Sequence, residues 1–411
     1  MSVDALACPF IFIAIFFESF VLVTLLSKPA RDARARKPGS ATPLVAVVVP
    51  CRNEAETIAA TTDSLLKLNY PADKLEIILV DNASTDDTPA IMARYQAHPN
   101  VTVLHAPERG KHKAVNIGIA ATEAEFIGCL DADSFVDPDA LNEIIPCFAS
   151  HRVAAVTAAM SIHQPHNIVE HMQNAEYSFG ITMRHAMASI NGLYVTPGPF
   201  SFYRRSVVEA LGGFRYGHQT EDMEMALRMQ KAGYEIENAP RARVYTRAPH
   251  TVLKLIKQRT RWTNGFLRNT LGEYRSLVLN RDHGVLGMLI LPFALTAVVS
   301  TALLFLLTIS QLTLQIVRGI EVRLGVPLSY ALAPRYAGFD WFYFPTSVFA
   351  LLGFIAMVAS LALVAYGRHL SQTPFHLGRS MASYLLYGLI APLWLVRSTA
   401  HVALGKNQAW K

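Results

Sequence analysis

The chain has 411 residues, enough for two domains or for one domain plus a membrane region, and 52% of them are hydrophobic, which is high for a purely soluble enzyme. Its net charge of +6 comes from locally grouped basic residues, a pattern that fits a membrane surface or an anionic substrate rather than nucleic acid. No zinc-finger spacing and no aromatic RNA-recognition pattern occurs, so no nucleic-acid partner is expected. The four cysteines form no C-x-x-C pair and predict neither a disulfide nor a zinc site.

The N-terminal residues predict a membrane-spanning helix. Residues 1–27 contain an almost wholly apolar run from Ala5 to Leu26, long enough to cross a bilayer. No basic segment precedes it, so a cleaved signal peptide is not expected. The basic residues of the linker 28–43 are expected in the cytoplasm, which puts the N-terminus outside. Glu18 within the span either faces a partner helix or polar cavity, or simply pairs or reaches the interface.

Residues 44–250 alternate between short apolar runs and helical patterns. Such alternation predicts an α/β domain with a doubly wound, mostly parallel sheet. Asn53 and Glu56 have the spacing of a helix-capping arrangement, and the absence of G-x-G-x-x-G after the first strand argues against a dinucleotide fold. The predicted strands are 44–49, 75–80, 101–105, 126–130 and 154–160, with a turn and strand over 196–203, and the predicted helices are 53–67, 87–97, 110–121, 168–188 and 220–231.

Two carboxylates follow one of these strands. Asp131 and Asp133 stand one residue apart at the carboxyl end of the strand 126–130, where open α/β sheets bind ligands. Residues i and i+2 share one side of an extended chain, and two carboxylates so close repel each other unless a cation joins them. Mg²⁺ and Mn²⁺ take carboxylate oxygens, and Mg²⁺ usually takes substrate phosphates as well. Taken alone, the pattern also fits a solvated loop with two acids.

The C-terminal part predicts one interfacial helix followed by membrane spans. Residues 251–283 combine apolar and basic residues at helical spacing, as in a helix that lies on a membrane surface. Within 284–411, the uncharged runs 284–317 and 341–367 are long enough to span a bilayer. The run 381–396 is only about 24 Å long at 1.5 Å per residue, which predicts a tilted or partial third span.

Four motifs occur in order along the chain: Asp81 at a strand end, Asp131-Ala132-Asp133, Thr220-Glu221-Asp222 at a helix start, and Gln258-Arg259-Thr260-Arg261-Trp262. This order resembles the membrane-embedded, processive family-2 glycosyltransferases, which include cellulose, chitin, hyaluronan and poly-N-acetylglucosamine synthases and carry D, DxD, (T/E)D and Q-x-x-R-W. The resemblance covers nearly the whole chain with its spans, and the last motif together with the DxD is highly specific. It implies a GT-A fold and a cytoplasmic domain that transfers a sugar.

The resemblance implies roles on the donor side. Asp81 would contact the uracil, although a turn that starts at Asp81 would also explain this residue. Asp131 would contact the nucleotide and, with Asp133, bind the Mg²⁺ or Mn²⁺ that holds the diphosphate. Lys111 matches a Gly-Lys position of the family near the nucleotide. Lys113 is an extra base beside it, so which lysine serves the nucleotide stays open.

On the acceptor side, the same resemblance makes Asp222 the general base that takes the proton of the attacking hydroxyl, and its place at a helix N-terminus is expected to keep it ionised. Arg261 would bind the diphosphate. Trp262 would stack on the acceptor sugar, with Gln258 and Glu221 hydrogen-bonding near it. The alternatives are ordinary helix capping for Glu221 and Asp222, and a basic interfacial helix with an aromatic anchor for the last motif.

The segment Thr196–Ser201 with Tyr203-Arg204-Arg205 resembles the Gly-Pro…Tyr-Arg-Arg segment of hyaluronan and chitooligosaccharide synthases and favours N-acetylglucosamine, although Pro197 departs from the small residue usual there. The prediction is a multi-pass plasma-membrane enzyme that uses a UDP-sugar to extend a β-linked polysaccharide with inversion, and it leaves room for an accessory export subunit. One alternative is an enzyme that adds a single sugar to a lipid acceptor. Another is a non-catalytic membrane partner or transporter built on this fold.

Overall fold

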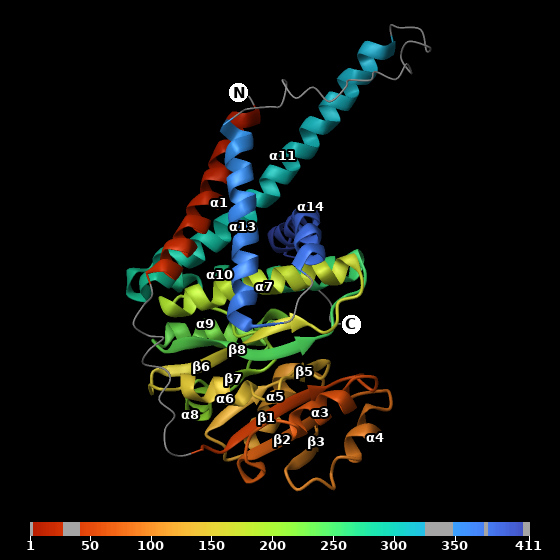
Figure 1. Cartoon of the computed structure of the whole chain (residues 1–411), viewed down its shortest axis with the longest axis vertical. Coiled ribbons are helices and arrows are strands. Elements are labelled where there is room, and N and C mark those ends of the chain that lie inside the picture. The colour runs from red at the N-terminus through yellow and green to blue at the C-terminus, as the bar shows by residue number, and fades with distance from the viewer. Residues whose placement is uncertain (1–2, 28–41, 325–347, 374–376, 406–411) are drawn as a thin grey trace.

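The computed structural model describes residues 3–27, 42–324, 348–373 and 377–405. An α/β domain lies at one end of the molecule, and long helices extend away from it (Figure 1). Most of the linker 28–43, and the stretch 325–347 in which the predicted span 341–367 starts, lie outside the described residues.

Within the described residues, eight strands form one sheet in the order β3-β2-β1-β4-β7-β6-β8-β5. β1 pairs in parallel with β2 and β4, as do β2 with β3 and β6 with β8. β7 runs antiparallel to β4 and β6, and β5 runs antiparallel to β8. The predicted α/β class with a mostly parallel sheet is therefore confirmed. The strands are β1 (Val45–Cys51), β2 (Leu75–Asp81), β3 (Val101–His105), β4 (Phe126–Cys129), β5 (Ser134–Val136), β6 (Val153–Ile162), β7 (Ser201–Arg204) and β8 (Glu235–Thr246).

The first strand shows why the strand sequences are continuously apolar. Along β1, Val45, Val47 and Val49 pack into one hydrophobic cluster, and Ala46 and Val48 pack into a second one. All five side chains are fully buried, as expected of a parallel strand covered on both faces. The helices of this domain are α3 (Ile58–Leu66), α4 (Thr88–Ala93), α5 (Lys111–Ala120), α6 (Ala140–Ile144), α7 (Ile168–Ser189), α8 (Arg205–Ala210) and α9 (Glu221–Lys231).

Some elements differ from the prediction. β5 and β8 are not among the predicted strands, because β5 has only three residues and β8 contains Pro240 at a shift of its register with β6. The capping role predicted for Asn53 is wrong, since α3 begins only at Ile58. Asn53 instead adopts a left-handed φ of 55° and accepts a hydrogen bond from the backbone N–H of Thr85 at 2.8 Å. The helix predicted over 87–97 is the shorter α4.

Four helices among the described residues are long and apolar enough to cross a membrane. They are α1 (Val3–Leu26), α11 (Leu291–Leu324), which continues a π-helical turn over Leu286–Ile290, α13 (Val348–Ser371) and α14 (Leu377–Ala403). The apolar part of α14 has 26 residues, about 39 Å at 1.5 Å per residue, so the last helix is longer than the predicted run 381–396. Figure 1 shows α14 almost end-on, whereas α1 and α13 run along the long axis of the view.

The membrane helices contact one another and the domain through small and polar side chains. Glu18 on α1 accepts a hydrogen bond from the hydroxyl of Ser360 on α13, so this carboxyl faces a partner helix. α13 approaches α7 closely: a Cβ on Gly367 would lie 1.9 Å from the carbonyl oxygen of Ser178. Thr182 on α7 also donates to the carbonyl of Leu363 at 2.6 Å. Small residues allow such close approach of helix backbones.

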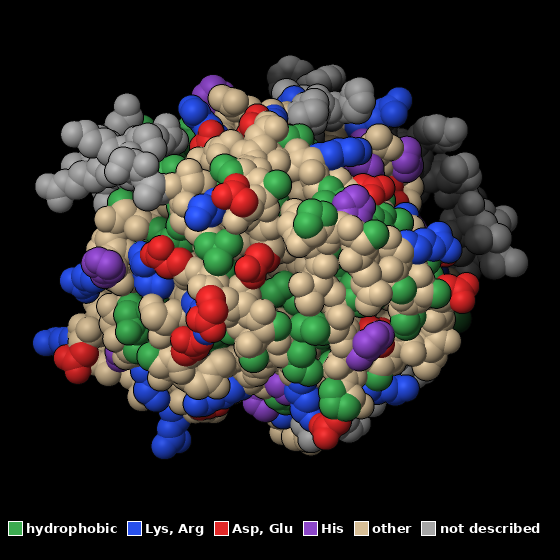
Figure 2. Space-filling model, turned by 90° about the horizontal axis from the view of Figure 1, so that it is seen from below, with side chains coloured by type: hydrophobic (Ala, Val, Ile, Leu, Met, Phe, Trp, Pro, Cys, Tyr) green, Lys and Arg blue, Asp and Glu red, His purple; other side chains and the backbone are tan. Residues whose placement is uncertain are grey.

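The two ends of the molecule present different surfaces. Figure 2 views the α/β domain from the end away from the long helices and shows acidic and basic side chains scattered among small apolar areas. On α11, by contrast, large apolar side chains are exposed along the helix, among them Leu306, Leu312 and Ile316. A large exposed apolar surface marks contact with a membrane or with another protein, so the long helices suit lipid and the domain suits water.

Candidate active site

A cleft of about 390 Å³ opens where β1, β2 and β4 end. Asp131 and Asp133 both line it, directly after the buried Leu130 that follows β4. The sheet edge predicted to carry the two carboxylates thus lies beside a cleft, as in other open α/β sheets. The lining residues are Pro50, Arg52, Asn53, Glu54, Asn82, Lys111, Asp131, Ala132 and Asp133.

The carboxylates of this cleft are close enough to disfavour one another's charge. Burial, together with the neighbouring Asp131 and Glu54, raises the pKa of Asp133 to about 6. Burial also raises the pKa of Glu54. A divalent cation would relieve this repulsion, so the donor set fits Mg²⁺ or Mn²⁺. Since no three His, Cys, Asp or Glu side chains converge on one point among the described residues, the other ligands would be water and substrate oxygens, as is usual for Mg²⁺.

Lys111 joins two parts of the site. It is the first residue of α5, and its Nζ lies 2.6 Å from Oδ1 of Asp131 and 3.1 Å from Oε1 of Glu221. Burial lowers the pKa of Lys111, but the surrounding carboxylates outweigh this effect and hold its pKa above the ordinary value. Lys113 instead pairs with Glu108. Of the two lysines considered, the structure therefore places Lys111 in the cleft.

Gly198 separates Asp131 from Asp222. Its backbone N–H donates to Oδ2 of Asp222 at 3.1 Å, and a Cβ on Gly198 would lie 2.9 Å from Oδ2 of Asp131 and 3.0 Å from Nζ of Lys111. The turn predicted around Pro197 and Gly198 thus lies between the donor-side carboxylate and the predicted base. Thr196 adds a second tie, because its hydroxyl donates to the backbone carbonyl of Asp222 at 2.8 Å.

The pKa of Asp222 is higher than its place at a helix N-terminus alone would make it. Burial and the neighbouring Glu221 together raise this pKa to about 6, against the opposing effect of Lys111. Removal from water and the adjacent carboxylate therefore outweigh the effect of the helix N-terminus on the pKa, and the carboxylate is still mostly ionised at neutral pH. A carboxylate with a pKa near neutrality is well suited to exchange a proton.

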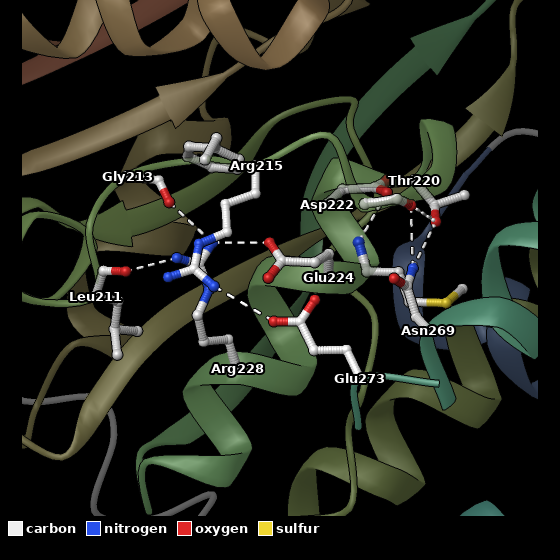
Figure 3. Close-up of polar contacts among 12 residues, drawn as sticks. Leu211, Gly213, Arg215, Thr220, Asp222, Glu224, Arg228, Asn269 and Glu273 are labelled. Atoms are coloured by element: carbon white, nitrogen blue, oxygen red, sulfur yellow. Dashed lines mark hydrogen bonds and ion pairs between the residues drawn. The ribbon is translucent and has the colours of Figure 1, made fainter. Parts of the chain in front are cut away.

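The start of α9 is held by polar contacts on both sides (Figure 3). Asn269 on α10 (Val252–Leu271) donates to the hydroxyl of Thr220 at 3.1 Å. Further along α9, Glu224 accepts from Arg228 at 2.7 Å and also from the hydroxyl of Tyr274. These buried contacts fix the first turns of the helix that carries Asp222.

The last motif lies on α10, next to the start of α9. Arg261 donates through Nη1 to the backbone carbonyl of Gln219 at 3.0 Å, just before α9 begins. Gln258 accepts from the guanidinium of Arg259 at 2.7 Å. Trp262 is half-buried against the hydrophobic cluster that contains Val45, Val47 and Val49, and the guanidinium of Arg259 lies over its ring at 4.1 Å from the centroid.

Asp81 is buried at the end of β2, and its oxygens already have partners. Oδ1 accepts from the backbone N–H of Ser84 at 3.2 Å, as the turn alternative expects, and Oδ2 lies 3.5 Å from Nδ1 of His105. The next residue, Asn82, lines the cleft and accepts from the N–H of Gly110 at 3.0 Å.

Sequence reasoning missed several residues of the site. Asn82 could have been found as a polar residue directly after a strand, at the edge where ligands bind. Glu54 and Arg259 gave no such indication, because their importance comes from contacts with distant parts of the chain. The structure brings Lys111, Asp131, Asp133, Glu221 and Asp222 into one region, and it places Gln258, Arg261 and Trp262 together on α10.

Comparison with known proteins shows the family of this chain. Residues 42–265 match the family described as glycosyltransferase-like family 2. Since this match covers more than half of the chain, the protein belongs to the family-2 glycosyltransferases. The resemblance seen in the sequence is thereby confirmed at the level of the family.

Two relatives show the range within the family. The chain is 30% identical over 252 residues to a poly-β-1,6-N-acetyl-D-glucosamine synthase of Staphylococcus epidermidis, a match that covers 61% of this chain and 60% of the relative. It is 29% identical over 267 residues to a β-monoglucosyldiacylglycerol synthase of Nostoc sp. strain PCC 7120, which covers 61% of this chain and 57% of that one. The chain thus aligns with less than two thirds of the length of either relative.

Among solved structures, the mannosyltransferase PcManGT from Pyrobaculum calidifontis, in complex with GDP-Man and Mn²⁺, is similar to nearly the whole chain. The TM-score is 0.56 at 22% identity, and the match covers 94% of this chain and 99% of that one. At this identity the likeness establishes the GT-A fold, which confirms the predicted fold class.

The position of Gly198 generates a prediction. In Gly198→Ala the added methyl carbon would lie 2.9 Å from Oδ2 of Asp131 and 3.0 Å from Nζ of Lys111. Both distances are shorter than van der Waals contact, so this ion pair must shift. We expect binding and turnover of a nucleotide sugar to fall by about 10- to 100-fold, because small displacements of positioning groups have effects of this size. The matched control is Gly319→Ala on α11, where the added methyl has open space. Unchanged nucleotide-sugar affinity in a folded Gly198→Ala protein would contradict a role of the Lys111–Asp131 pair in binding the nucleotide sugar.

Proposed function

We propose that this chain transfers N-acetylglucosamine from its UDP derivative to the end of a growing β-linked polysaccharide, with inversion at the anomeric carbon. The observation that carries the proposal is the ion pair between Lys111 and Asp131. Lys111 also pairs with Glu221, and Gly198 lies between this group and Asp222. These contacts support a nucleotide-binding edge and a base that lie side by side. The name of the Staphylococcus epidermidis relative supports the choice of sugar and of a polymeric product.

The donor would bind at the cleft. Lys111 lies where it can neutralise diphosphate oxygens, and Arg261 on α10 offers a planar group that suits phosphate. Asp131 and Asp133 would hold Mg²⁺ or Mn²⁺, which supplies charge stabilisation to the leaving diphosphate when it is bound. Asp81 and Asn82 lie at the end of β2, on the side of the cleft proposed for the uracil.

The acceptor would approach from α10. A hydroxyl that attacks the anomeric carbon must lose its proton, and Asp222 is the carboxylate proposed to accept it. As the new glycosidic bond forms, the bond to the diphosphate breaks and UDP leaves. Trp262 would stack on the acceptor sugar, and Gln258 and Glu221 would hydrogen-bond near it.

The second candidate is transfer of a single sugar to a lipid acceptor. The Nostoc relative, named as a glycolipid synthase, favours it at nearly the same identity. Either product would be made by a multi-pass plasma-membrane protein whose catalytic domain faces the cytoplasm, as proposed from the basic linker. An accessory export subunit is expected only if the product is a polymer. A non-catalytic partner or transporter would not need Asp131, Asp133 and Asp222 to lie together.

A panel of UDP-sugars tests the proposal directly. Membranes that contain the protein should convert UDP-N-acetylglucosamine into an oligosaccharide series in which mass analysis shows successive additions of one sugar. A single addition to extracted lipid would establish the second candidate. If the folded protein turned over none of the UDP-sugars, the result would favour the alternative of a non-catalytic partner or transporter.

Removal of the metal gives a separate prediction. Excess chelator should abolish turnover, and Mg²⁺ or Mn²⁺ should restore it, because two mutually repelling carboxylates need a cation to hold a diphosphate. Asp133→Ala should lose metal-dependent nucleotide binding, whereas Glu108→Ala, at an exposed ion pair outside the cleft, should keep it. Full activity in excess chelator would reject the role given to Asp131 and Asp133.

The base can be tested by substitution and by pH. Asp222→Asn keeps the size but cannot accept a proton, so kcat should fall by roughly 10²–10⁴-fold with donor binding nearly unchanged. In the unsubstituted protein, kcat should decline as the pH drops below about 6, because the raised pKa of Asp222 then leaves the base protonated. The variant should lack this decline. A change in KM alone would make Asp222 a binding residue.

A further inference from the structure

Arg259 occupies an unspecified position of the last motif, and the proposed reaction gives it no role. It is 3% exposed, whereas the nearby Lys257 on the same helix is exposed to solvent. A buried charge is costly unless it is paired and hydrogen-bonded. The contacts of Arg259 therefore indicate its role.

Within the motif, Arg259 contacts both side chains assigned to the acceptor. Its guanidinium lies over the indole of Trp262, three residues further along α10, with Cζ 4.1 Å from the ring centroid. Its Nη1 donates to Oε1 of Gln258 at 2.7 Å. One face of the indole is thus covered by a planar cation, and the amide group of Gln258 is turned so that its nitrogen remains available to donate.

Outside the motif, Arg259 is held by two other helices. Its Nη2 donates to the carboxylate of Glu176 on α7, and its guanidinium also lies 5.6 Å from the ring centroid of the adjacent Tyr177. Tyr387 on α14 lies near both Glu176 and Arg259 and interacts electrostatically with them. Arg259 is therefore fixed by α7 and lies beside a membrane helix, while it contacts the acceptor residues on α10.

We propose that Arg259 is a positioning residue for the acceptor site. Held by Glu176, with Tyr387 beside it, Arg259 fixes the plane of the Trp262 indole and the orientation of the Gln258 amide, so that the acceptor sugar is received on the indole face opposite the guanidinium. This inference rests on the proposed function, because Trp262 and Gln258 have their acceptor role there. It also makes the position of α14 a determinant of the acceptor site.

The test compares Arg259→Lys with the parent protein. Lysine keeps the charge that Glu176 requires but lacks the planar group that lies over the indole and reaches Gln258. We expect UDP-N-acetylglucosamine binding within twofold of normal, and both the Kd and the KM for N-acetylglucosamine oligosaccharides raised about tenfold, in line with the loss of a desolvated cation–π contact. Tyr387→Phe, a milder change, should shift the same two constants in the same direction. The exposed control Lys257→Gln should shift neither.

A double-mutant cycle separates positioning from folding. If Arg259 acts through Trp262, then Arg259→Lys should add little further loss of acceptor affinity in a Trp262→Ala background. Independent, additive losses would overturn the proposal. So would unchanged acceptor constants in Arg259→Lys, or a variant that loses only yield and thermal stability. Failure of the parent protein to transfer any sugar or to bind the oligosaccharides would instead refute the proposed function, and the positioning role with it.

Discussion

The contact between the start of α9 and the middle of α10 is the constraint on which the site depends. A Cβ on Gly265 would lie 2.3 Å from the hydroxyl of Thr220, so the two helices meet at a distance that only glycine permits. Asn269 donates to the same hydroxyl. Asp222 lies two residues after Thr220, and Arg261 lies one turn before Gly265. A single close approach therefore sets the spacing between the proposed base and the motif that would bind diphosphate and acceptor.

The electrostatics of the site depend on the same arrangement. Lys111 neutralises carboxylates from two separate elements, Asp131 after β4 and Glu221 at the start of α9. Asp133 has hydroxyl partners, at 3.1 Å from Ser134 and 3.4 Å from Thr246, and these do not offset its burial next to other carboxylates. Because the acids around Lys111 outnumber it, this part of the cleft favours a further cation. Charge balance thus joins the donor side to the acceptor side of the site.

The parts that the sequence predicts well are those determined locally. Apolar runs that end in Asp81 and Asp131 predict strand ends, and parallel pairing brings such ends to one edge of the sheet. The raised pKa of Asp222 could not be predicted, because it depends mainly on burial, and burial comes from parts of the chain distant in the sequence. Asn53 fails as a cap for a similar reason, since its partner Thr85 belongs to another strand-to-helix connection. The role of Arg259 could not be predicted from the sequence either, because its partner Glu176 lies 83 residues away.

The family match covers only part of the chain that forms the site. The family match ends at residue 265 and so includes the sheet, the start of α9 and most of α10, which are the parts proposed to bind the nucleotide sugar and to carry the base. The helices α11, α13 and α14 lie beyond it. α14 nevertheless contacts the last motif through Ser398, whose hydroxyl donates to the carbonyl of Thr260 at 3.3 Å, and its Tyr387 interacts electrostatically with Arg259. Because the membrane helices approach the acceptor side, selection between a polymer end and a lipid is expected to lie in the part of the chain that the family match does not cover.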